Sequence, residues 1–172
     1  MVSKTICWGF ESLSARQKDN MIRVYPNVVE HELIDDALLN ADYSSAVPWA
    51  GNIPNLNSIH PIKHRINRTM KQFGELKNVE LLVYTAGSYS TPHIDDYEFN
   101  GDYKWVMTGI LFTSEPEEYS GGELVFNTFN MELKPPKGTL VLFPAGPEST
   151  PYVHSVKPVT GGKRTVMVYR FV

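Results

Sequence analysis

The chain has a single cysteine, Cys7, among its 172 residues, so it cannot form an internal disulfide. This excludes the disulfide-stabilised scaffolds of small secreted proteins. Long apolar runs are also absent: the opening residues lack the apolar stretch of a secretory signal, and no segment approaches the length needed to cross a membrane. We therefore expect a cytoplasmic setting, a reduced Cys7 and no membrane partner.

An excess of positive charge is missing as well. The chain carries 16 Lys and Arg against 19 Asp and Glu, with a pI near 5.9. Without a general basic footprint, nucleic acid is not an expected partner. A hydrophobic content of 42% is enough for one packed core at this length, so we expect residues 1–172 to form a single domain. No apolar stripe indicates an oligomeric state.

Apolar residues recur at the helical period in two stretches of the first half. The first runs from Leu33 to Ala41, and the second runs from Ile59 to Phe73, where Ser58 is a candidate cap and Gly74 follows the end. Pro61 falls in the first turn, where proline is tolerated. Between these helices we expect an irregular loop over residues 42–57, pinned by Trp49.

From Val79 onward the pattern changes to short β-branched and aromatic runs separated by Gly, Pro, Asn and Asp. Helices followed by strands predict an α+β fold whose sheet closes on itself as a sandwich or barrel. The predicted strands are Val79–Thr85, Trp105–Thr113, Glu123–Phe126, Thr139–Phe143, Val153–Val156 and Thr165–Val172.

A histidine and an aspartate stand two residues apart on a strand-like segment, at His93 and Asp95. An extended chain places both on one face and turns Ile94 toward the core. With His154 far downstream, two imidazoles and one carboxylate can occupy one face of an octahedral iron(II) and leave the other face open. The pair alone is a common pattern, and a structural histidine at a strand end is the alternative for His154.

Arg164 follows His154 by ten residues. A strand, a turn and a returning strand would bring its guanidinium back beside the metal. This planar fork can hold a carboxylate through two parallel hydrogen bonds. A dicarboxylate that chelates iron at one end and pairs with Arg164 at the other would explain both features, whereas a surface arginine paired with an acidic side chain is the alternative.

These segments together resemble the prolyl 4-hydroxylase-like branch of the iron(II) and 2-oxoglutarate-dependent dioxygenases. The resemblance covers the C-terminal half and implies a double-stranded β-helix, or jelly-roll, core with supporting N-terminal helices. The resembling features occur in family order: Tyr84, residues 87–95, residues 121–126 (Gly-Gly-Glu-Leu-Val-Phe), residues 138–144 and the segment from His154 to Arg164.

The resemblance also implies roles for single residues. His93, Asp95 and His154 would bind Fe(II), Arg164 would hold the distal carboxylate of 2-oxoglutarate, and Tyr84 would donate its hydroxyl to this cosubstrate. A core aromatic is the alternative for Tyr84. Dioxygen is the second implied cosubstrate, and ascorbate is a candidate cofactor.

The implied reaction is hydroxylation of an unactivated C–H bond, foremost in a prolyl residue of a peptide or protein, with release of succinate and CO2. The carboxylate of Asp95 favours hydroxylation over halogenation. Three departures from the family pattern bear on whether the family's substrate also applies to this chain. Leu124 replaces a common threonine, Tyr169-Arg170 replaces a common tryptophan, and no peptide-binding domain precedes the core. A free amino acid or a nucleobase is the alternative substrate.

Two other protein classes remain as alternatives: a non-catalytic metal-binding jelly roll and a zinc hydrolase, for which no acid or base has recognisable spacing. The remaining histidines are expected to be structural or solvated. These histidines are His31, His60 and His64. Residues 96–104 are a candidate lid. The sequence assigns no role to the other residues near the expected mouth of the site, which are Tyr89, Asp96, the 97–103 segment and Arg170.

Overall fold

A computed structural model describes residues 22–41, 60–96 and 105–172. Several expectations therefore lie outside the described residues. They concern Cys7, the 42–57 loop with Trp49, the cap at Ser58 and the candidate lid beyond Asp96.

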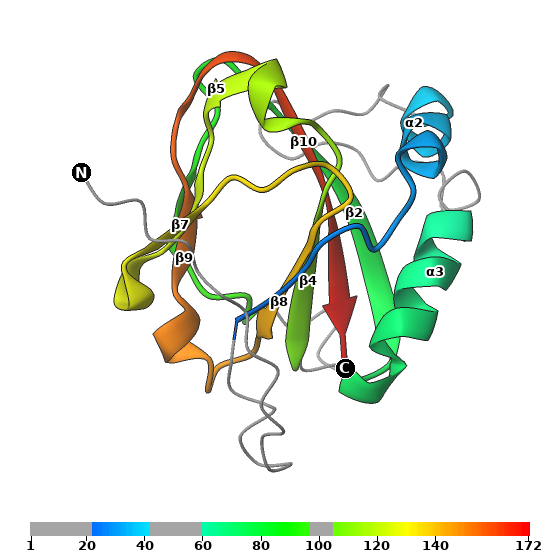
Figure 1. Ribbon diagram of the computed structural model, residues 1–172. Coiled ribbons are helices and arrows are strands. Elements are labelled where there is room, and N and C mark those ends of the chain that lie inside the picture. The colour runs from blue at the N-terminus through cyan, green and yellow to red at the C-terminus, as the bar shows by residue number, and fades with distance from the viewer. Residues whose placement is uncertain (1–21, 42–59, 97–104) are drawn as a thin grey trace, which may run out of the picture.

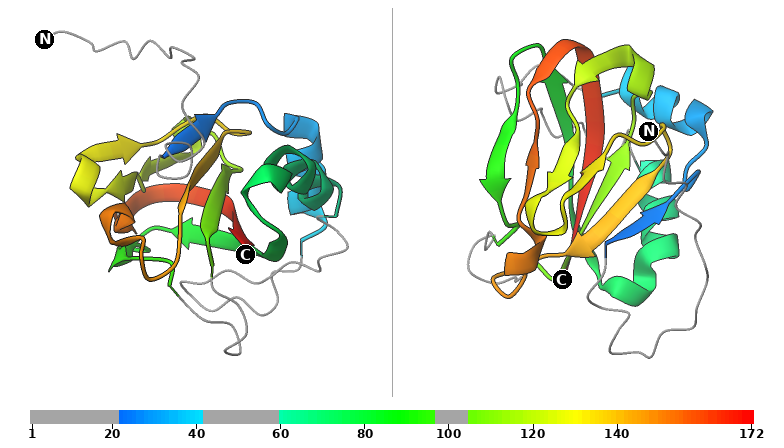
Figure 2. Two further views of the ribbon diagram at one scale, coloured as in Figure 1. Left: turned by 90° about the horizontal axis from the view of Figure 1, so that it is seen from below. Right: turned by 60° about the vertical axis from the view of Figure 1, so that its left-hand side comes forward.

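Two antiparallel sheets form the body of the molecule (Figures 1 and 2). The major sheet has the order β1 (Arg23–Tyr25), β8 (Leu140–Pro144), β4 (Met107–Phe112), β10 (Val159–Phe171), β2 (Leu76–Thr85), and β5 (Tyr119–Gly121) pairs with the start of β10. The minor sheet has the order β3 (Ser90–His93), β9 (His154–Val156), β6 (Leu124–Phe126), β7 (Met131–Leu133). Short 3-10 turns span Lys71–Phe73, Pro116–Glu118, Asn127–Phe129 and Thr150–Tyr152.

The helices α2 (His31–Leu39) and α3 (His60–Met70) cover the outer face of the major sheet (Figure 1). Alternation along β10 explains the two cores of the molecule. Met167, Tyr169 and Phe171 pack under the helices, whereas Val166 and Val168 pack between the sheets. Both faces of the second half of the strand are therefore buried, which is why residues 166–169 form a continuous apolar run.

The expected α+β class and jelly-roll core with helices along one side are confirmed. Pro61 stands in the first turn of α3, and Gly74 follows its 3-10 extension with a φ of 139° that glycine accepts easily. The three-residue strands β1, β5 and β7 were not predicted, whereas the equally short β6 and β9 lie within the predicted runs Glu123–Phe126 and Val153–Val156. In the described part, no helix is long and apolar enough to span a membrane.

The predicted strand, turn and returning strand between His154 and Arg164 are present as β9, a short connection and β10. The two strands belong to different sheets, because β9 lies in the minor sheet and β10 lies in the major sheet. The two residues between these strands, Lys157 and Pro158, carry the chain from one sheet to the other. Arg164 therefore reaches the site from the sheet opposite His154.

Candidate active site

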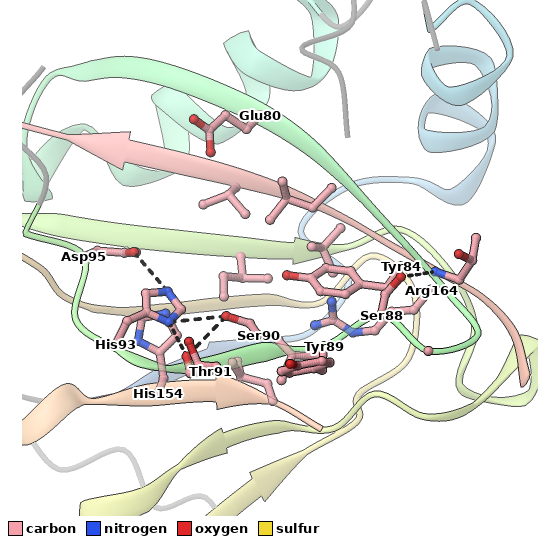
Figure 3. A pocket seen from close by; sticks show the side chains of 18 of the residues that line it. Glu80, Tyr84, Ser88, Tyr89, Ser90, Thr91, His93, Asp95, His154 and Arg164 are labelled. Carbon is pink, nitrogen blue, oxygen red and sulfur yellow. Dashed lines mark hydrogen bonds and ion pairs between the residues drawn. The ribbon is translucent and has the colours of Figure 1, made fainter. Parts of the chain in front are cut away.

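The three predicted metal ligands meet at one end of the minor sheet. His93 ends β3, His154 begins β9, and the two residues are direct partners in the antiparallel ladder. Asp95 follows two residues after His93, and one ligand atom from each side chain lies within 4.8 Å of the others (Figure 3). In the described residues this is the one such cluster. Ile94, expected in the core, is only half-buried.

Backbone carbonyls fix the orientation of both imidazoles. The Nδ1–H of His93 donates to the carbonyl oxygen of Thr91 at 2.8 Å, and that of His154 donates to the carbonyl oxygen of Tyr152 at 3.1 Å. The Nε2 lone pairs are left to bind a metal, an arrangement that is usual for metal-ligating histidines. Burial lowers the pKa of His154, which favours the neutral imidazole that a metal requires.

The carboxylate of Asp95 is buried and is held from two sides. The hydroxyl of Thr108 donates to Oδ2 at 2.7 Å, while a terminal nitrogen of Arg170 lies 3.4 Å from Oδ1. Burial alone would raise the pKa of Asp95, but Arg170, His154 and Thr108 outweigh it and lower this pKa. The group is therefore an ionised carboxylate, and its Oδ1 atom lies 3.7 Å from Nε2 of His93.

Arg164 lies at the far end of the same pocket, which has a volume of about 1040 Å³ (Figure 3). Its side chain is only 1% exposed, and its three guanidinium nitrogens have no hydrogen-bond partner among the described residues. The ring centroids of Tyr84 and Phe112 lie 4.8 Å and 5.2 Å from the guanidinium carbon. These cation–π contacts offset part of the free-energy cost of burying the charge. A buried guanidinium without an acceptor is expensive, so the site suits an anion.

The pocket wall between the triad and Arg164 is aliphatic. Tyr84 lies along this wall beside Arg164, and burial raises the pKa of its hydroxyl, which therefore keeps its proton and remains a donor. Aliphatic side chains from both sheets complete the wall and make the space between the two charged ends apolar: Leu82, Ile110, Leu124, Val156, Val166 and Val168.

The sequence reasoning missed two partners of Asp95, although a signal for both was present. Arg164, Val166, Val168 and Arg170 alternate along β10 and all line the pocket, so period two places Arg170 on the inner face. The same period places Thr108 on the inner face of β4 with Ile110. One terminal nitrogen of Arg170, Nη2, contacts Asp95, and the other, Nη1, lies 3.5 Å from Oε2 of Glu80.

The other polar candidates lie apart from the triad or at its margin. His31 bonds through Nε2 to the carbonyl oxygen of Lys137 at 3.0 Å, which fits the expected structural role. His64 lines a separate pocket beside Arg68 on α3. Tyr89 lines the active-site pocket and is 57% exposed, and Asp96 is exposed beyond Asp95.

Comparisons with known proteins agree with this geometry. Residues 79–171 match the family model of the 2OG-Fe(II) oxygenase superfamily. The PKHD-type hydroxylase PiuC of Pseudomonas aeruginosa is 37% identical over 112 residues, which are 61% of this chain and 46% of that protein. A PKHD-type hydroxylase of Gluconacetobacter diazotrophicus is 39% identical over 88 residues, 47% of this chain and 37% of the relative. The chain thus spans less than half the length of these relatives.

A solved structure shows the same fold. The viral collagen prolyl hydroxylase of Paramecium Bursaria Chlorella virus-1, in complex with 2OG, superposes with a TM-score of 0.66 at 21% identity and covers 88% of this chain and 96% of its own. The family match spans more than half of the sequence and includes the triad and Arg164. The chain belongs to the 2OG-Fe(II) oxygenase superfamily.

Proposed function

We propose that this protein is an Fe(II)- and 2-oxoglutarate-dependent dioxygenase that hydroxylates an unactivated C–H bond and releases succinate and CO2. One observation carries the proposal: Arg164, which is buried and has no acceptor in the part of the chain that the structure describes, lines the same pocket as a two-histidine, one-carboxylate cluster. The spacing suits a small dicarboxylate whose two ends carry different tasks. A binding module without catalysis needs no such combination of an open metal face and a carboxylate clamp.

The donor set fits iron(II). The Nε2 atoms of His93 and His154 and the Oδ1 atom of Asp95 would hold the metal, because the other ring nitrogens are hydrogen-bonded and Oδ2 accepts the short bond from Thr108, whereas Oδ1 has only the longer 3.4 Å contact with Arg170. Three protein ligands on one face leave positions for cosubstrate and dioxygen. Iron bound there would supply dioxygen activation, the step that no side chain of the pocket performs.

The remaining work falls to side chains of this chain. Arg164 would bind and orient the distal carboxylate of 2-oxoglutarate, and Tyr84 would donate its hydroxyl to the cosubstrate from the aliphatic wall. The aliphatic residues exclude water around the cosubstrate, which strengthens these polar contacts. His93, whose side chain is 42% exposed, lies on the side of the triad from which a substrate would approach.

For the prime substrate we propose a prolyl residue of a peptide or protein. The support is the resemblance of the sequence and the likeness of fold to a viral collagen prolyl hydroxylase. The exposed edge of the site at Tyr89 and His93 suits a substrate that remains partly outside the pocket. Activity of the whole protein, a peptide partner, a cytoplasmic location, ascorbate dependence and a single domain over residues 1–172 all stay predictions.

The test is succinate formation from 2-oxoglutarate by protein loaded anaerobically with Fe(II) and then exposed to oxygen. We expect succinate from the wild type even without prime substrate, and none from His154→Ala or Asp95→Ala. Proline-containing peptides, free amino acids and nucleobases would then be compared for their stimulation of turnover. Normal succinate formation by either triad variant would exclude the assigned metal site.

A further inference from the structure

Tyr119 on β5 has a buried hydroxyl that no group satisfies. The residue is 4% exposed, and its hydroxyl has no hydrogen-bond partner in the part of the chain that the structure describes. Such groups are uncommon in native proteins and each needs an explanation. Outside Tyr119, the described residues with orphaned buried polar atoms are Trp105, Arg164 and Arg170, and Arg164 contributes three of those atoms.

Tyr119 and Arg164 project from the same face of neighbouring strands. In the antiparallel pair of β5 and β10, Tyr119 is opposite Gly162, and Arg164 lies two residues further along. Side chains two apart share a face, so the diagonal neighbours meet. Gly122 confirms their closeness: a Cβ atom there would lie 3.0 Å from Cδ of Arg164 and 3.2 Å from Cδ2 of Tyr119.

The ring of Tyr119 is fixed while its hydroxyl is left unengaged. Nζ of Lys134 lies 4.3 Å from the ring centroid and donates to the carbonyl oxygen of Tyr119 at 2.8 Å. Burial raises the pKa of Tyr119, although the positive charge of Arg164 opposes this rise. The hydroxyl therefore keeps its proton at neutral pH and can donate a hydrogen bond beside the guanidinium.

One anion would satisfy both orphaned groups. A carboxylate offers about four acceptor positions, and a guanidinium fork uses two of them. The remaining positions can accept from hydroxyl groups on either side of the fork. Tyr84 is one neighbour of Arg164, and Tyr119 is the other.

We propose that Tyr119 is a further cosubstrate-binding residue, whose hydroxyl donates to the same distal carboxylate that Arg164 holds. The inference rests on the proposed function, in which 2-oxoglutarate supplies this carboxylate. It explains why two neighbouring side chains, Tyr119 and Arg164, both have buried polar atoms without a hydrogen-bond partner among the described residues.

The test measures dissociation constants by calorimetry on the full chain loaded with redox-inert Mn(II). Two ligands are compared: 2-oxoglutarate, and 2-oxohexanoate, which keeps the chelating end but has no second carboxylate. Tyr119→Phe should weaken 2-oxoglutarate binding by about tenfold or more, as expected for a lost hydrogen bond to a charged group. Binding of 2-oxohexanoate should not change. Tyr169→Phe, another buried tyrosine, which lies under the helices, is the matched control and should leave both constants unchanged.

A second background separates direct contact from an effect through Arg164. In Arg164→Lys protein, Tyr119→Phe should cause a further loss of 2-oxoglutarate affinity. No further loss would mean that Tyr119 acts only by positioning the guanidinium and would overturn the assignment. Unchanged 2-oxoglutarate affinity in the single variant, or equal losses for the two ligands, would also overturn it.

Thermal unfolding of the ligand-free protein gives an independent reading. Because the hydroxyl has no hydrogen-bond partner among residues 22–41, 60–96 and 105–172, Tyr119→Phe should not lower the melting temperature. A clear drop would reveal a structural partner and overturn the inference. Arg164→Met distinguishes this proposal from the proposed function. If Arg164→Met leaves 2-oxoglutarate binding intact, the proposed function fails; if it weakens binding and Tyr119→Phe does not, only the role of Tyr119 fails.

Discussion

At the scale of single residues, the three metal ligands are oriented by different means. Backbone carbonyls hold both imidazoles, so no side-chain substitution at the carbonyl positions removes those hydrogen bonds. Asp95 depends instead on side chains, with Thr108 on Oδ2 and Arg170 near Oδ1. A substitution at one of these two partners can therefore disturb the orientation of the Asp95 carboxylate while all three metal-binding side chains stay in place.

Thr108→Val should weaken Fe(II) binding by about 10- to 100-fold, the usual effect of losing an outer partner of a metal ligand. Valine keeps the shape of threonine but cannot donate to Oδ2, so the carboxylate loses its fixed rotation. Anaerobic titration of apoprotein with Fe(II) measures the effect. Thr113→Val is the control, because this buried threonine donates to Thr165 and not to a metal ligand. Equal affinities in the wild type and Thr108→Val would show that the hydrogen bond from Thr108 is not needed to orient Asp95.

The residue scale also shows where sequence reasoning stops. The spacing of His93 and Asp95 named two ligands, because period two is a local property of an extended chain. Thr108 and Arg170 lie on β4 and β10. Their link to Asp95 arises only from strand order, which local spacing does not contain.

At the scale of elements, the junction between β5 and β6 shapes the cosubstrate end of the pocket. Gly122 has a φ of 71°, and a Cβ atom on it would lie 3.0 Å from Val159 as well as close to Arg164 and Tyr119. The turn thus requires glycine for two reasons, its left-handed backbone and the close approach of side chains. The pattern Gly-Gly-Glu-Leu was read from the sequence as a family feature, and the structure supplies its physical cause.

Gly122→Ala should destabilise the protein by at least about 1–2 kcal/mol, the cost of a left-handed conformation for a residue with a Cβ atom. It should also weaken 2-oxoglutarate binding, since Arg164 must shift. Urea unfolding and calorimetry measure the two effects. Gly161→Ala is the control, because its Cβ atom would meet nothing within 4 Å. Similar losses in both variants would contradict the steric explanation.

The strands themselves were largely predicted, and the errors follow from their length and pairing. The strands β2, β4 and β8 were found near their true bounds, because each carries a readable apolar pattern. The strand β10 begins at Val159, well before the predicted start at Thr165, because its first residues are mostly polar or glycine. β1, β5 and β7 have three residues each and depend on their neighbours. The strand, turn and returning strand expected between His154 and Arg164 are present, but sequence proximity does not show that the chain changes sheets between them.

At the scale of the whole molecule, the pocket joins the two sheets. The histidines come from the minor sheet and Arg164 from the major sheet, and the aliphatic wall has members from both. A cosubstrate that bridges the metal and Arg164 would therefore connect the two layers. Ligand binding should act on the stability of the fold as a unit.

Mn(II) should raise the melting temperature, and 2-oxoglutarate should raise it further only when the metal is present. At a ligand concentration of 100 times the dissociation constant, each step is worth about 2.7 kcal/mol. A chelator should reverse both steps. In Arg164→Met, Mn(II) should still raise the melting temperature, but 2-oxoglutarate should add little to it. In Asp95→Ala, neither ligand should raise the melting temperature. Calorimetric melting measures these changes. If 2-oxoglutarate raised the melting temperature by the same amount without metal, the cosubstrate would not be chelated by the metal.

The sequence by itself determined the class of fold and singled out His93, Asp95, His154 and Arg164 as the candidate site residues, because each prediction rests on local periodicity or on motifs that keep their order along the chain. Tertiary structure alone decided that Arg164 enters from the sheet opposite His154, that Thr108 and Arg170 hold Asp95, and that Tyr119 lies beside Arg164. These relations join residues that are distant in sequence. They depend on which strands pair and which sheets face each other, and long-range packing of both cores sets that choice.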